Sequence, residues 1–312
     1  MANTIEYAKV FQNELDRAAV QKATSGWMEL NSDMVKYNGG NEVKIPSIVM
    51  DGLADYDRDN GFVDGTVDLK WETQTMTMDR ARRFTIDEND VDETNFVLTA
   101  ATMMGEFQRK QVVPEIDAYR YSTLAAKGIT AKHASGGYIP TAKDIYSKLL
   151  YDIAQVQDVV GDDEPLIITM SMTAAMMLDL ADETKKILDT SNFTKGDVTL
   201  KVKSLNGQHP IIRVGGGRFK TKYIFNDGKT SGQEKGGFAA ATDAQDINWI
   251  ICPADTAIAV SKTDNMRIFD PNTYQKKRAW AMDYRKFHDL WVPKNKVNNI
   301  FVNVQQSLPT EG

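Results

Sequence analysis

The sequence predicts an α+β fold, because three kinds of segment follow one another along the chain. Residues 61–86 alternate apolar and polar side chains, which is typical of a strand with one apolar face and predicts a long exposed β-hairpin. Residues 90–128 predict one very long helix, and shorter helices and strands follow it. Since an isolated two-stranded hairpin is only marginally stable in water, we expect another copy of the protein to cover its apolar side.

The composition excludes several classes of protein. The 312 residues, 42% of them hydrophobic, are enough for one or two cores, and the formal net charge is -6. That charge argues against a protein that coats nucleic acid, which needs a basic face, but it allows a protein that only encloses nucleic acid. The single Cys252 forms no intrachain disulfide and is expected to be buried, which suits a reducing cytoplasm. We find no signal peptide and no apolar stretch near the ~20 residues of a membrane helix.

The first 61 residues predict an arm and a linker. Residues 4–22 have helical spacing, residues 36–41 resemble a turn, and residues 43–48 predict a short strand. This portion holds too few apolar residues for a core of its own. Residues 51–61 predict an acidic, turn-rich linker, whose spacing does not match that of an EF-hand calcium loop.

The predicted hairpin carries its apolar residues on one strand and a cluster of arginines on the returning strand. Its return passes through residues 79–87, where Arg80, Arg82 and Arg83 lie among acidic residues. The planar guanidinium binds carboxylates with two parallel hydrogen bonds, so an acidic surface of a neighbouring subunit is favoured over nucleic acid as the partner of these arginines.

The long helix has predicted start, break and end signals. Asp90 and Glu93 have the spacing of a capping box, and Gly128 is the expected C-terminal stop. Pro114 lies inside, where it should kink or split the helix because it removes one backbone hydrogen bond.

The segment from residue 141 onward alternates helices and short strands. Thr141 and Asp144 begin an amphipathic helix that ends at Gly161, and residues 166–170 predict a buried strand. Ser171 is the expected cap of a third helix that runs through Leu188, with Met172, Met176 and Met177 as core residues. Residues 226–243 predict a flexible surface loop, and two more strand candidates lie in the tail. Further short strands are expected at 198–202, 211–214, 222–225, 247–251 and 256–260.

Catalytic and metal-binding patterns are weak. The three histidines are far apart and lack the spacing of a zinc site, and the Gly215–Gly217 run lacks the spacing of a phosphate-binding loop. We therefore expect a turn at these glycines, no enzymatic activity, no metal and no cofactor. A hydrolase or phosphate-binding enzyme built on the Gly215 loop is an alternative, and it predicts a deep pocket with converging polar groups there.

Several stretches resemble the major capsid proteins of tailed bacteriophages, which have the Hong Kong 97-type fold. The similarity to capsid proteins from phages and prophages of Gram-positive hosts covers nearly the whole chain. It is carried by EVKIP, LADYDRDNGF, VDLKWETQTMTMDRAR, DVDETNF, EFQRKQVVPEIDAYRYS and DLWVPKNKVNNIF.

The resemblance implies a domain organisation and a role. Subunits of this family form hexamers and pentamers of an icosahedral shell that encloses double-stranded DNA in the virion, after assembly in the cytoplasm of the bacterial host. The implied partners are copies of the same chain, a separate scaffolding protein and a portal, without a membrane; the separate scaffold is expected because the sequence begins directly at the arm, unless the chain is already processed. The implied parts are an N-terminal arm (1–41), an extended loop (42–86), a peripheral domain (87–140 and 246–312) and an axial domain (141–245).

The resemblance also assigns candidate residues. Some relatives crosslink a loop lysine to an asparagine of another subunit, and Lys70 lies in the corresponding region, but no partner asparagine is identified. An encapsulin-like protein compartment is the first alternative, and a phage tail or adhesion protein is another. The candidate interface residues in the extended loop are Arg58, Val67, Leu69, Lys70, Trp71, Arg80, Arg82 and Arg83, and those of the spine helix are Phe96, Met104, Phe107 and Arg109.

Overall fold

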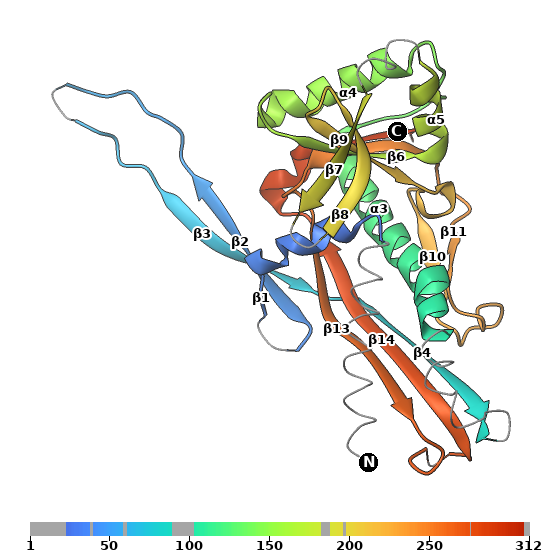
Figure 1. Cartoon of the computed structure of the whole chain (residues 1–312). Coiled ribbons are helices and arrows are strands. Elements are labelled where there is room, and N and C mark those ends of the chain that lie inside the picture. Colours follow the sequence, from blue (N-terminus) through green and yellow to red (C-terminus); the bar gives the residue numbers. More distant parts are fainter. Residues whose placement is uncertain are drawn as a thin grey trace.

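The computed structural model describes residues 23–37, 40–58, 61–88, 103–181, 188–195, 198–274 and 276–308. The predicted helix at 4–22, the capping pair Asp90 and Glu93, and the candidate Phe96 lie outside these ranges. The chain forms a compact upper body, a long sheet that extends below it, and a loop that projects to one side (Figure 1).

A seven-stranded mixed sheet forms the centre of the upper body. Its strand order is β5-β15-β12-β6-β9-β8-β7, and neighbours are antiparallel except for the pairs β15–β5 and β6–β9. Residue 246 is the position at which the resemblance divides the axial from the peripheral domain. Strands that precede and follow it pair directly in this sheet, so the sheet is continuous across that position. The strands are β5 (Ala134–Ser135), β6 (Leu166–Ser171), β7 (Leu188–Lys195), β8 (Val198–Leu205), β9 (His209–Val214), β12 (Ile247–Pro253) and β15 (Phe301–Val304).

Helices cover both faces of this sheet. Every residue of β6 and β12 is buried, as expected for central strands with two covered faces. Helices α4 (Ile145–Val160) and α5 (Met172–Leu180) pack on one face, and α3 (Val113–Thr130) packs on the other. Alternate side chains of β6 divide accordingly, with Ile167 in the core beneath α3 and Ile168 in the core beneath α4 and α5.

The lower sheet contains three long antiparallel strands in the order β13-β14-β4. They are β13 (Ile258–Phe269), β14 (Ala279–Trp291) and β4 (Met78–Asp87). The projecting loop is built from β2 (Glu42–Met50) and β3 (Val67–Thr75), with the short β1 (Lys36–Tyr37) beside β2. A small ribbon of β10 (Tyr223–Phe225) and β11 (Phe238–Ala240) lies in and beside the predicted loop at 226–243.

The predicted pairing of the hairpin at 61–86 is wrong. β3 pairs with β2, whereas β4 pairs with β14, so the two predicted strands separate at Met76. Met76 is buried in a core with Phe287 and Trp291, and the backbone N–H and hydroxyl of Thr77 both donate to the carboxylate of Asp289. This anchor redirects the chain from the projecting loop into the lower sheet.

The spine helix differs from its prediction at its C-terminal end, whereas its predicted start lies outside the described residues. Residues 103–107 are helical, a π-helical turn follows at Gln108–Val112, and α3 then carries Pro114 in its first turn. The helix is therefore not split at Pro114 but changes to π-helical hydrogen bonding directly before it. Gly128 is not the stop: it is buried inside α3 against Val302, and the helix ends at Thr130. Lys132 then adopts the left-handed conformation, with φ of 62°.

The first half of residues 141–245 follows its prediction more closely than the second. α4 is confirmed, and Ser171 caps α5, accepting a hydrogen bond from the N–H of Ala174 at 3.2 Å. However, α5 ends at Leu180, and Leu188 instead begins β7. Met172 and Met176 are exposed, not core residues, because this short helix turns its alanines and Leu178 toward the sheet; Met177 packs against the core.

The remaining short helices connect these parts. They are 3₁₀ helices at Gly26–Met34, Gly216–Arg218 and Lys294–Asn299. Cys252 is buried as predicted. Within the described ranges, no helix combines the length and the apolar character needed to cross a membrane.

Candidate interaction surface

The base of the projecting loop is fixed to the body by a small apolar core. Val43 and Ile45 of β2 are almost fully buried, together with Met76 at the end of the loop. They pack against residues of β13 and β14, namely Ile258, Val260, Phe287 and Trp291. The loop is therefore rigidly attached at its root, although it leaves the body beyond that point (Figure 1).

The distal half of the loop exposes an apolar strip. Residues 67–71 of β3 are all exposed, on both faces of the strand. Because directly opposite residues point to the same face, the register places Met50 beside Val67 and Pro46 beside Trp71. Side-chain exposure reaches 68% at Met50 and Val67, 58% at Leu69 and 39% at Trp71. We call Met50, Val67, Leu69 and Trp71 the loop face.

The end of the loop, residues 51–66, adds a second apolar group. Thr66 donates from its N–H and its hydroxyl to the Asp51 carboxylate, both at 2.7 Å, and these hydrogen bonds lower the pKa of Asp51. Asp57 and Gly61 exchange backbone hydrogen bonds near the tip. We call the exposed Leu53, Tyr56, Phe62 and Val63 the loop tip; the rings of Tyr56 and Phe62 meet edge to face at 5.0 Å.

An apolar strip of this kind is a candidate contact surface. Fully burying a side chain such as Leu or Val contributes about 1.5–3 kcal/mol, and contiguous exposed apolar surface on soluble proteins marks interaction sites. The alternation in the sequence predicted Val63, Val67, Leu69 and Trp71 as one apolar face, whereas Met50 and the other three residues of the loop tip were not predicted. The sequence nevertheless contains a pattern that could have identified the loop tip, because Leu53, Tyr56 and Phe62 are large apolar residues among turn-forming aspartates and glycines.

The charged candidates on the loop are exposed. Arg58 lies near the tip, and Lys70 forms an exposed ion pair of 2.7 Å with Asp68 on the same strand. Trp71 has the Lys36 ammonium 4.8 Å from its ring centre, a cation–π contact that leaves part of the ring open.

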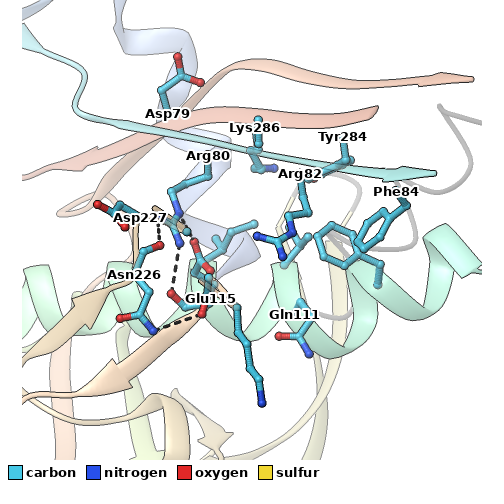
Figure 2. Close-up of a pocket in the computed structure, with 18 of the residues that line it drawn as sticks. Asp79, Arg80, Arg82, Phe84, Gln111, Glu115, Asn226, Asp227, Tyr284 and Lys286 are labelled. Carbon is cyan, nitrogen blue, oxygen red and sulfur yellow. Dashed lines mark hydrogen bonds and ion pairs between the residues drawn. The ribbon is translucent and has the colours of Figure 1, made fainter. Parts of the chain in front are cut away.

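The three arginines of β4 have partners within their own chain. Arg80 donates to Glu115 at 2.6 Å, to the Asn226 carbonyl at 2.8 Å and to the Gly237 carbonyl at 3.2 Å (Figure 2). Arg83 makes a two-pronged ion pair with Asp283, which raises the pKa of its guanidinium. Among the described residues, the hydrogen bonds of Arg82 are two long ones, of 3.4 and 3.5 Å, to the Glu234 carbonyl.

The described candidates of the spine helix divide between core and surface. Met104 is buried, and the Phe107 ring packs edge to face on Phe84 at 4.9 Å. Arg109 is exposed and pairs with Glu106 one turn earlier. The contribution of any of these residues to a subunit contact stays a prediction.

The Gly215–Gly217 run forms the predicted turn between β9 and β10. Arg218 forms an ion pair of 3.0 Å with the buried Asp117, and Phe219 is buried in the core, so the turn is tied down by its neighbours. These glycines do not line the groove shown in Figure 2. In the part of the chain that the structure describes, no group of three or more His, Cys, Asp or Glu residues is arranged to hold a metal ion.

Comparisons with known proteins identify the fold. No protein-family model matches the chain, and no curated protein sequence matches it. The structure is similar to the capsid of Ralstonia phage GP4, at 9% identity and a TM-score of 0.54, over 88% of this chain and 86% of that one. It is similar to the capsid of cyanophage P-SCSP1u, at 9% identity and 0.53, over 86% and 84%. It is also similar to the mature capsid of bacteriophage PhiM1, at 11% identity and 0.52, over 87% and 84%.

These similarities confirm the predicted α+β class and the Hong Kong 97-type capsid fold. The shared architecture spans more than four-fifths of the chain, although very few residues are identical.

Proposed function

We propose that this chain, which has the phage capsid fold, is the major structural subunit of an icosahedral phage head. Copies of it would form hexamers and pentamers that enclose double-stranded DNA. In this arrangement residues 141–245 would meet around the centre of each hexamer or pentamer, and residues 42–86 would overlap a neighbouring subunit.

The observation that supports this proposal is the projecting loop. Its root is fixed in the apolar core with Phe287 and Trp291, while the loop face and loop tip are exposed. A standard protein interface buries about 1,600 Å² in total, and closed symmetry limits the number of copies in an assembly. Each copy of the chain carries one exposed apolar loop, which could bury surface of this size against a neighbouring copy.

The net charge of the chain agrees with a shell that encloses DNA without binding it tightly. The formal net charge of -6 disfavours the many phosphate contacts that a DNA-binding surface makes. A separate scaffolding protein that sets the size of the head, and a portal through which the genome enters, are also part of the proposal.

The direct test is negative-stain electron microscopy of the purified protein and of two neighbouring variants. Leu69→Ala removes part of the loop face, and Asp68→Ala is its matched control, because the two residues are adjacent on β3 and point to opposite faces. We expect closed shells from the parent and the control and few from Leu69→Ala. Tubes, or monomers at high concentration, would contradict a shell subunit.

The contents of the particles test the second half of the proposal. Particles isolated from host cells should contain nuclease-protected double-stranded DNA. A docked protein cargo in place of DNA would instead identify a protein compartment.

A further inference from the structure

A groove of about 790 Å³ lies where the lower sheet meets the body. Strands β4 and β14 form one wall, the π-helical turn and the start of α3 form the second, and the loop between β10 and β11 forms the third (Figure 2). The volume lies within the usual range of small-molecule sites, about 300–1,000 Å³. π-Helical turns are rare and occur frequently at functional sites.

Hydrogen bonds within the chain hold the loop at residues 226–237 in its conformation without a ligand. The Asp227 carboxylate accepts hydrogen bonds from the N–H groups of Lys229 and Thr230, both at 2.8 Å, and from the Thr230 hydroxyl at 2.7 Å. Gly228 and Gly236 have φ of 73° and 68°, and a β carbon on them would lie 3.3 and 3.4 Å from Nη1 of Arg82. Glycine at both positions therefore lets the loop backbone lie directly against this guanidinium.

The charges along the groove leave an excess of cations. Among the described residues, no carboxylate forms an ion pair with Arg82, Lys229 or Lys235, which are all exposed. The lining carboxylates are already engaged. Glu115 is paired with Arg80 and Asp79 with Arg285, whereas Asp227 is held by the hydrogen bonds within its loop and also attracts Lys229.

The floor of the groove contains a buried histidine. His288 lines it and is almost fully buried, and its Nδ1 has no hydrogen-bond partner in the described structure. Burial lowers the pKa of this imidazole well below its usual value, and the charges of Arg120, Lys286 and Arg80 lower it further. The side chains of Phe84 and Phe107, both partly buried, form an aromatic wall beside the cations.

We infer that this groove binds a phosphate ester of nucleotide size, with its phosphoryl group on Arg82, Lys229 and Lys235 and its planar base against Phe84 and Phe107. A phosphoryl group carries up to about two negative charges and three acceptor oxygens. The Arg82 fork can donate two parallel hydrogen bonds to it, and the two lysines supply point charges. A single carboxylate would leave most of these cations without a partner, whereas a nucleotide fills both the charged and the aromatic parts.

The test is isothermal titration calorimetry of the parent protein with ATP, inorganic pyrophosphate, adenosine and a short DNA duplex. We expect saturable binding of ATP, weaker binding of pyrophosphate, and no measurable binding of adenosine alone. The variant Arg82→Gln/Lys235→Gln should bind ATP at least about tenfold more weakly, since hydrogen bonds to charged groups are among the stronger ones. Lys222→Gln is the control, because this exposed lysine pairs with Asp243 outside the groove and should leave the affinity unchanged.

Three results would overturn the inference: no saturable binding of ATP, an equal loss of affinity in the control, or binding of the DNA duplex in preference to ATP. Thermal unfolding of each variant separates lost binding from lost structure. The inference does not depend on the proposed function, because microscopy of the same variants measures shell formation separately from nucleotide binding.

Discussion

Gly128 on α3 faces Val302 on β15 so closely that a β carbon at position 128 would lie 2.7 Å from Cγ2 of the valine. The helix and the sheet approach each other at this point because glycine has no side chain. The close contact joins the spine helix to the C-terminal strand, and it explains why the helix contains a glycine two residues before its end.

Gly128→Ala should destabilise the protein. Alanine favours the helix by about 1 kcal/mol, but the overlap with Val302 and with Ile300, 3.1 Å away, costs about 1–3 kcal/mol in a packed core. We expect a net loss in the free energy of unfolding, measured by urea denaturation. Gly216→Ala is the control, since a β carbon there meets nothing within 4 Å. An alanine at 128 that stabilised the protein would show that the sheet moves away easily.

Arg80→Met should loosen the contact between the lower sheet and the body. The substitution removes hydrogen bonds to Glu115, Asn226 and Gly237 and leaves the largely buried Glu115 carboxylate without its partner. We expect a loss of roughly 1.5–3 kcal/mol in unfolding free energy and faster amide hydrogen exchange in residues 226–237.

Arg109→Met provides the comparison for that experiment. Its ion pair with Glu106 is exposed on a helix surface, so its removal should leave the unfolding free energy nearly unchanged. If the two variants lose equal amounts of unfolding free energy, the hydrogen bonds of Arg80 do not stabilise the contact between residues 226–237 and β4.

Trp71→Ala should impair assembly more than folding. Trp71 is 39% exposed, its described cation partner Lys36 is exposed as well, and the residue lies outside the apolar core at the root of the loop. We expect an unfolding free energy within about 1 kcal/mol of the parent and a much lower yield of shells by sedimentation. Asp68→Ala, on the opposite face of β3, should assemble normally. Normal shell yield with Trp71→Ala would exclude the loop face as a contact surface.

Acid should destabilise the folded subunit through two histidines. Burial lowers the pKa of His288 and of His209 below the ordinary value near 6.5, so the unfolded chain takes up protons that the folded chain does not. The stability from these groups is present above pH 6.5 and falls with acidification below it, by up to about 1.4 kcal/mol per pH unit for each histidine.

The measurement is the unfolding free energy of the parent, His288→Gln and His209→Gln between pH 7.5 and 5. Each variant should show a shallower slope than the parent, and because the residues lie on β14 and β9, the effects of the two substitutions should add. A parent whose stability is flat over this range would rule out the buried neutral imidazoles as its cause.

The existence of most elements could be predicted from local patterns, but their pairing could not. The apolar spacing from Ile145 to Val160 and the run at Leu166 each define an element through neighbouring residues. By contrast, the alternation of apolar and polar residues in 67–75 and 78–87 predicts a strand but does not indicate which strand it pairs with. The actual partners, β2 and β14, are set by tertiary contacts of Met76 and Thr77 that have no local signature.

The candidate surface was predictable to a similar degree. The alternation identified Leu69 and Trp71 as an exposed apolar strip, since strand geometry alone places them on one face. The arginine cluster was harder to interpret, because Arg80 binds two backbone carbonyls in addition to a carboxylate, and carbonyl acceptors occur in every sequence. Gly128 was ambiguous for a related reason: a glycine can mark a turn or a close approach of two backbones.

The continuity of β3, Met76 and β4 has a mechanical consequence. A pull on the projecting loop runs along β4, which is joined to β14 by ten consecutive residue pairs. Because these hydrogen bonds lie across the direction of the pull, they share the load in shear and do not open one after another. In the proposed shell, tension from a pressurised interior would therefore be spread over the full length of the lower sheet.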